Sequence, residues 1–210
     1  MPDSFSERAK ANILPLSHGR RFPAVFEEWR VSGQVRDHGA TVATCQLCEQ
    51  EHLRYHFEIL NEFTSYEMWV GSNCILRFGV AVYDGQRRLT RQQARKKLAS
   101  LIEQVRYDVC MKALRKLVKA ENNEILASAL RFLAEHGSLS PRFAFVVFWR
   151  LQEHQIEHNP AFFKINLRRQ KFLRDLEAMP LARVHVLWPA LSGAQRRKAI
   201  GLGITPPPAE

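Results

Sequence analysis

The chain has 210 residues, of which 46% are hydrophobic, and its formal net charge at neutral pH is +10. This composition is typical of a globular protein with a hydrophobic core and excludes a disordered chain. No segment approaches the roughly 20 apolar residues that a membrane span requires, and the N-terminus lacks the apolar region of a secretory leader. We therefore expect a cytoplasmic protein that makes no membrane contact.

The positive charge is concentrated in one part of the chain. Residues 1–86 contain eight basic and eleven acidic residues, whereas residues 87–119 contain eleven basic and two acidic ones. Residues 120–210 contain twelve basic and eight acidic residues. A local excess of cations is typical of a surface that binds a polyanion, although a charged outer face is commonly only solvated.

Short strands and turns are predicted to dominate residues 1–86, because apolar and polar residues alternate there between Gly- and Asp-containing turns. We expect a short helix at 24–30 and strands at 34–36, 40–44, 53–60 and 66–70. The last two strands are separated by a turn and should form a β-hairpin. We predict that this N-terminal region is one domain.

Three of the four cysteines fall in this region, at a spacing that favours a structural zinc site. Cys45 and Cys48 form a C-x2-C knuckle, and Cys74 follows in a turn-like segment after the hairpin. Two thiolates from one tight turn and a third from the returning chain supply three of the four ligands of a tetrahedral Zn²⁺. The sequence therefore predicts Zn²⁺ as a cofactor.

The fourth ligand is predicted to be His56, with His52 and Cys110 as alternatives. Cys110 lies within a predicted helix, where a cysteine more often behaves as a small buried apolar residue. Three unrelated buried thiols, a redox pair and a disulfide framework are the other interpretations of the cysteines. A redox pair would leave Cys74 unexplained, and disulfides are rare in the cytoplasm.

Residues 87–210 are predicted to form a basic, mainly helical domain. Thr90 and Gln93 form a capping box for a long amphipathic helix at 90–120. Further helices are expected at 124–135, 143–151 and 161–179. The nearly continuous apolar character of 143–151 predicts that this helix is buried at the centre of a bundle.

Basic residues lie mainly off the apolar stripes of these helices. A solvated helix face usually mixes both signs of charge, so an unmixed basic face favours phosphate contacts. The residues predicted to bind nucleic acid are Arg87, Arg88, Arg91, Arg95, Lys96, Lys97, Lys112, Arg115, Lys116, Lys119, Arg168, Arg169 and Lys171. Near the hairpin, we expect Trp69, Asn73 and Arg77 to contact bases or a short sequence motif.

The common catalytic and phosphate-binding motifs are absent from the sequence, including the P-loop, G-x-G-x-x-G, H-E-x-x-H and G-x-S-x-G. Asp84, Glu103 and Asp108 are acids that a magnesium-dependent nuclease could use, but their spacing does not single them out. We therefore expect that the protein is not an enzyme.

The segments Cys45-x2-Cys48, 53–57 and Gly71-Ser72-x-Cys74 resemble zinc modules of plasmid- and phage-borne bacterial proteins. A small basic protein with such a module followed by helices is similar to the zinc-finger large subunit of type IV CRISPR effector complexes. The resemblance implies a non-catalytic subunit that contacts guide RNA, other protein subunits and the duplex motif beside the DNA target. It carries Cys45, Cys48 and Cys74 over as metal ligands and leaves the fourth ligand open.

These observations predict an α+β fold, with a small zinc-stabilised β-hairpin module followed by a mainly α-helical body. The predicted function is non-catalytic binding of nucleic acid. The alternative is a protein-interaction adaptor, such as a phage- or plasmid-encoded inhibitor, that does not bind nucleic acid. Salt-dependent binding to unrelated DNA and RNA would distinguish these two functions.

Overall fold

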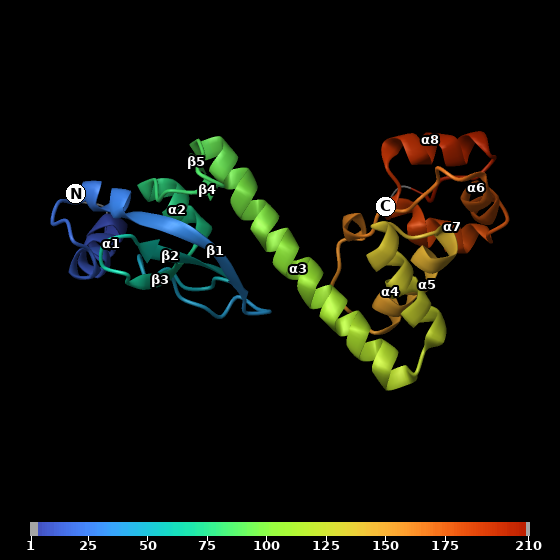
Figure 1. Cartoon of the computed structure of the whole chain (residues 1–210), viewed down its shortest axis with the longest axis horizontal. Helices are drawn as coiled ribbons and strands as arrows, with labels where there is room; N and C mark the ends of the chain where they lie inside the picture. Colours follow the sequence, from blue (N-terminus) through green and yellow to red (C-terminus); the bar gives the residue numbers. More distant parts are fainter. Residues whose placement is uncertain (1–3, 209–210) are drawn as a thin grey trace. The chain divides into compact units, whose positions relative to one another are not determined.

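The computed structural model describes residues 4–208, and the chain divides into two compact units after Arg106. The predicted α+β fold class is confirmed, because a small antiparallel sheet near the N-terminus is followed by a mostly helical body (Figure 1). The predicted domain boundary, between residues 86 and 87, lies in the turn that joins β4 (Tyr83–Asp84) and β5 (Arg87–Arg88), and it stays a prediction. Within residues 4–208, no helix combines the length and the apolar character needed to cross a membrane.

The sheet of the first unit has three strands in the order β1-β2-β3, which span Trp29–Asp37, Tyr55–Asn61 and Glu67–Val70. The predicted hairpin is present, since β2 pairs antiparallel with β3. Phe57 and Ile59 alternate with more polar residues along β2 and are fully buried in the core of this unit. This alternation places one face of the sheet against the core.

Helices cover the core of the first unit. They are α1 (Ser4–Ile13), the short η1 (Leu14–Leu16) and η2 (Ala24–Glu28), and α2 (Ser72–Phe78). The rings of Phe26 and Phe78 stack with centroids 4.6 Å apart, which attaches α2 to the segment before β1.

Two local predictions in this unit are wrong. The segment at 40–44 is not a strand, because only Ala43 pairs with Leu53 and the chain then leaves the sheet to form the cysteine loop. The segment at 71–74 is not a simple turn, because α2 begins at Ser72. Gly79 ends α2 in the left-handed conformation (φ 68°), a common helix stop that could have indicated the helix from sequence.

The long helix α3 (Arg91–Glu121) has almost the predicted bounds. Leu98 is buried in the core of the first unit, and Cys110 and Leu114 are buried in the core of the second. Val109, an apolar residue of the same helix, is 55% exposed. Helix α3 therefore contributes buried residues to both cores.

The second unit is a helical bundle. It contains α4 (Glu124–His136), α5 (Pro141–Glu153), η3 (Pro160–Phe162), α6 (Gln170–Glu177), α7 (Leu181–Leu187), η4 (Trp188–Ala190) and α8 (Gly193–Gly201). Helix α5 contacts α4, α6 and α7, which confirms the predicted central position of its apolar segment.

The predicted helix at 161–179 is wrong, because only α6 and η3 are helical in this range. Phe163, Ile165 and Leu167 are buried and alternate with more exposed residues. The extended segment pairs with Leu139, whose amide donates to the Lys164 carbonyl at 2.8 Å. Apolar residues at every second position of this segment are the sequence signal that indicates an extended conformation.

Phe148 offers a test of the helical core. Its side chain is 1% exposed and meets the Phe163 ring edge-to-face at 5.6 Å, whereas the adjacent Trp149 is 46% exposed. We predict that Phe148→Ala lowers the free energy of unfolding of this unit by about 3–5 kcal/mol. Trp149→Ala, the control, should lower it by about 1 kcal/mol or less. Chemical denaturation measures both, and equal losses would contradict the placement of α5.

Candidate metal centre

Three buried sulfur atoms converge in the first unit. The Sγ atoms of Cys45, Cys48 and Cys74 all lie within 4.8 Å of one another, with separations of 3.7 Å between Cys45 and Cys74 and 3.2 Å between Cys74 and Cys48. Sulfur ligands of a tetrahedral zinc ion, each about 2.3 Å from the metal, lie about 3.8 Å apart. These separations suit a common ion and are far longer than the roughly 2.05 Å of a disulfide bond.

The knuckle that carries Cys45 and Cys48 is closed by backbone hydrogen bonds. At its base, Ala43 and Leu53 exchange two bonds, at 3.0 and 2.9 Å. Inside the loop, the Glu49 amide donates to the Cys45 carbonyl at 2.8 Å. The tight turn therefore holds both cysteines on the same side of the loop.

Side chains and backbone groups of the knuckle attach it to its neighbours. Gln46 accepts a hydrogen bond from the Trp69 amide on β3 at 2.6 Å and donates its own amide to the Trp69 carbonyl at 3.0 Å. Leu47 is fully buried, and its carbonyl accepts a bond from Asn12 of α1 at 3.1 Å. The loop is thus fixed against both the sheet and a helix.

The third sulfur comes from α2, because Cys74 lies in the first turn of this helix. The backbone amide of Gly71, the residue before α2, donates to the Cys45 sulfur at 3.4 Å. Amide donors of this kind stabilise negative charge on a sulfur ligand and orient it. The start of α2 therefore contributes a sulfur and a hydrogen-bond donor to the same centre.

The pKa values of the three thiols differ because the sulfurs interact. The hydrogen bond from Cys74, together with amide donors that include Gly71, lowers the pKa of Cys45 to about 5 against the effect of burial. The interaction with Cys45, followed by burial, raises the pKa of Cys74, and burial raises the pKa of Cys48. Ionisation of one sulfur therefore opposes ionisation of the others, and a bound divalent cation would remove this opposition.

His56 is the predicted fourth ligand. It lies on β2 with only 5% of its surface exposed, and it is not one of the residues whose ligand atoms all lie within 4.8 Å of one another. Burial, followed by the charge of His38, lowers the pKa of His56, whereas the negative charge of Cys45 partly opposes this effect. Its Nε2 atom has no hydrogen-bond partner within residues 4–208, so this nitrogen is available to a ligand.

His38 was not identified from sequence and contacts the ring of His56. The Nε2 atom of His38 lies 3.3 Å from Nδ1 of His56. When His56 Nδ1 donates its proton to His38, Nε2 of His56 carries the lone pair that a metal ion needs. No sequence motif could have indicated this pair, because sheet pairing brings the two residues together.

The two alternative fourth ligands have different environments. His52 is largely exposed and lines a hollow of about 160 Å³ together with Cys45 and Cys74. Cys110 is fully buried among apolar residues of the second unit, and burial raises its pKa to about 11. Cys110 therefore has the buried, apolar surroundings that a cysteine within a helix more often has.

Most of the basic residues predicted in the first unit are exposed. Arg87, Arg91, Arg95 and Lys96 are exposed, and none of these four makes an ion pair with another described residue. Lys97 is half-buried and pairs with Asp84 at 3.0 Å. The remaining one, Arg88, is exposed and donates to the Gly79 carbonyl at 3.2 Å.

In the second unit, the predicted cations on α3 are also exposed and unpaired within the described part of the chain. They are Lys112, Arg115, Lys116 and Lys119. Arg168 and Arg169 precede α6, and Lys171 lies in its first turn. These last three residues do not share the long helix face that the sequence predicted.

Two of the three residues expected to contact bases, Trp69 and Arg77, make cation–π contacts. The guanidinium of Arg36 lies 4.2 Å from the centroid of the half-buried Trp69 ring. The guanidinium of Arg77 lies 4.3 Å from the Phe5 ring centroid. Asn73 is exposed and lines the hollow beside Cys74.

The acids considered for a nuclease all have interactions with other residues. Asp84 pairs with Lys97, and Glu103 pairs with Arg106 at 2.9 Å. Within residues 4–208, the three acids are not part of a group of closely spaced metal-binding side chains.

The fold and the sulfur cluster define this chain as an α+β protein with three buried cysteines that could hold a metal ion. No protein-family model, curated protein or solved structure matches the chain.

The three sulfurs can be tested by substitution. We predict that Cys45→Ala, Cys48→Ala or Cys74→Ala each removes most of the bound divalent metal, because three sulfurs are needed to replace the hydration shell of the ion. Cys110→Ala, the matched control, should leave the metal content unchanged. Elemental analysis of purified protein measures the result, and full metal content in any of the first three variants would contradict a shared site.

Proposed function

We propose that the protein is a cytoplasmic, non-catalytic, zinc-containing nucleic-acid-binding protein. Zn²⁺ is held by Cys45, Cys48, Cys74 and Nε2 of His56 and stabilises the first unit. Zinc is the favoured metal because thiolates with one imidazole form a common structural donor set for this ion. The unpartnered, buried Nε2 of His56 supports the choice of fourth ligand.

The observation that carries the nucleic-acid proposal is the group of unpaired, exposed cations at the start of α3 and just before it. Residues 87–119 contain eleven basic residues and only two acidic ones. Unpaired cations on one helix repel one another, and phosphate groups would relieve this repulsion. Phosphate contacts supply affinity without requiring a particular sequence.

The resemblance to the large subunit of type IV CRISPR effector complexes supports a narrower version of this proposal. In this version, the nucleic acid is guide RNA and the duplex beside a DNA target, and further protein subunits are partners. Asn73 and Arg77, which are exposed on α2, are the residues proposed to contact the duplex motif.

One observation favours the alternative function as a protein-interaction adaptor. Trp149 is exposed on α5, its ring is stacked on Phe145, and the guanidinium of Arg183 lies 4.9 Å from the Phe145 ring centroid. Exposed tryptophan beside arginine is typical of protein interfaces. An adaptor of this kind would use α5 and α7 and would not require phosphate contacts.

The ligand assignment is tested by metal affinity. We predict that His38→Ala weakens zinc binding by about 10–100-fold, as is typical for removal of the partner of a metal-bound histidine. His56→Ala should weaken zinc binding further, because it removes the ligand itself. Competition with a chromogenic chelator measures both affinities.

His52→Ala is the control for this experiment and should bind zinc like the unmodified protein. A loss of zinc affinity in His52→Ala together with full affinity in His56→Ala would show that His52, and not His56, is the fourth ligand.

The nucleic-acid proposal is tested by the salt dependence of binding to unrelated RNA and duplex DNA. We predict that the triple variant Arg91→Gln, Arg95→Gln, Lys96→Gln flattens the slope of log affinity against log salt by about two to three units. The reason is that each lost phosphate contact releases about one counterion fewer. Fluorescence anisotropy measures the slopes.

The matched control removes the same charge elsewhere in the first unit, through Arg8→Gln, Lys10→Gln and Arg20→Gln. These three residues are exposed and lie outside the proposed contact set. If the two triple variants change the salt slope equally, the slope reflects only the net charge of the protein and not a specific contact surface. No binding by the unmodified protein at low salt would favour the adaptor.

A further inference from the structure

A groove in the second unit takes no part in the metal centre. It lies along α3 and α4 and extends to the segment around η3, with a volume of about 580 Å³. Small-molecule sites commonly have volumes of about 300–1,000 Å³ and apolar walls with a few polar groups. The size of the groove is therefore that of a small-molecule site.

Apolar side chains form most of the walls. Met111 of α3 and Leu133 of α4 are buried, whereas Leu130 is half-buried. Tyr107 and Phe162 add two aromatic rings that meet edge-to-face at 5.7 Å. A ligand in this groove would exchange water for contact with methylene, methyl and ring carbons.

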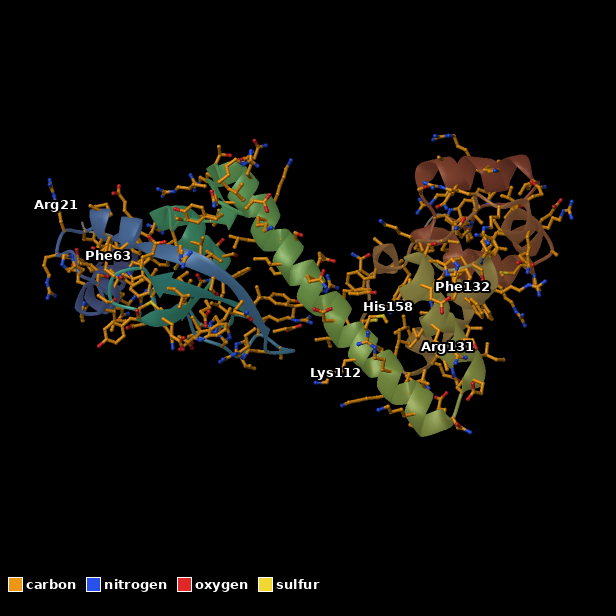
Figure 2. The ribbon with its side chains drawn as sticks, in the orientation of Figure 1. Arg21, Phe63, Lys112, Arg131, Phe132 and His158 are labelled. Atoms are coloured by element: carbon orange, nitrogen blue, oxygen red, sulfur yellow. The ribbon has the colours of Figure 1, made fainter. Side chains whose placement is uncertain are left out.

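The groove is also lined by four cations and by no acidic residue among those described. The cations are Arg115 and Lys119 of α3, Arg131 of α4, which is labelled in Figure 2, and Lys164 after η3. All four are exposed, and none makes an ion pair within residues 4–208. A ligand that complements the groove therefore needs negative charge as well as an apolar body.

We propose that this groove binds a small amphipathic anion, with an unbranched hydrocarbon chain against the apolar walls and a carboxylate or phosphate head paired with the cations. The two requirements act together. A short anion would leave the apolar walls in contact with water, and a cationic amphiphile would meet like charge. The proposal goes beyond nucleic-acid binding and does not depend on zinc.

The experiment is titration calorimetry of the full chain with four probes, each below its micelle-forming concentration. The probes are dodecanoate, dodecyl phosphate, acetate and dodecyltrimethylammonium. We expect the first two to bind at least about tenfold more tightly than the last two, because only they combine a chain with negative charge. The ratio of the first two affinities identifies the preferred head group.

Equal binding of dodecyltrimethylammonium would show adsorption of any hydrocarbon chain, and equal binding of acetate would show an anion site alone. Either result would overturn the proposal, as would the absence of binding by both anionic amphiphiles.

Two variants locate the site. Ala134→Phe fills the groove and keeps all four cations, and it should abolish dodecanoate binding. Ala182→Phe, at an exposed alanine of α7 that does not line the groove, is its control. Unchanged dodecanoate affinity in Ala134→Phe would show that the ligand binds elsewhere and would overturn the proposal.

The charge is tested with Arg131→Gln and Lys164→Gln combined, which should weaken dodecanoate binding by about tenfold. The control is Arg174→Gln with Arg197→Gln, which removes the same charge from exposed positions of α6 and α8 outside the groove. Equal effects of the two double variants would contradict a specific role for the groove cations. Arg131 and Lys164 are not in the proposed nucleic-acid surface, so failure here leaves that proposal unaffected.

Discussion

The meeting of three buried sulfurs is the contact on which the first unit depends. It joins the loop that carries Cys45 and Cys48 to α2, which carries Cys74. Because the sulfurs come from segments far apart in the chain, their contact holds the loop at Cys45 and Cys48 against the start of α2. A metal ion bound by all three would turn this contact into a covalent-like crosslink, which is how small modules compensate for a limited core.

Local patterns in the sequence explain which elements of the structure could be predicted. The alternation along β2 and β3 is strong enough to identify the hairpin, and the capping residues and length of α3 identify that helix to within one or two residues. The spacing of the three cysteines predicted that they would meet. Each of these signals is a periodicity, a cap or a cysteine spacing in the sequence itself, so tertiary contacts are not needed to recognise it.

Features set by tertiary contacts were not predictable in the same way. His38 meets His56 only because β1 pairs with β2 and the loop after β1 returns to the sheet. The basic and apolar residues after η3 led to the prediction of a helix there. Pairing with Leu139 makes this segment extended instead. In both cases a partner distant in sequence decides the local structure.

The backbone bridge between Ala43 and Leu53 has a consequence for how an ion would reach its ligands. The bridge does not involve sulfur, so backbone hydrogen bonds alone hold the loop closed. The thiols of Cys45 and Cys48 are therefore brought together without a metal ion. Cys74, in contrast, belongs to a short helix that is separately attached. The start of α2 nevertheless already lies against the loop, because Gly71 donates to the Cys45 sulfur and the Cys74 sulfur contacts the other two. All three sulfurs would therefore be in place for an ion without rearrangement of the backbone.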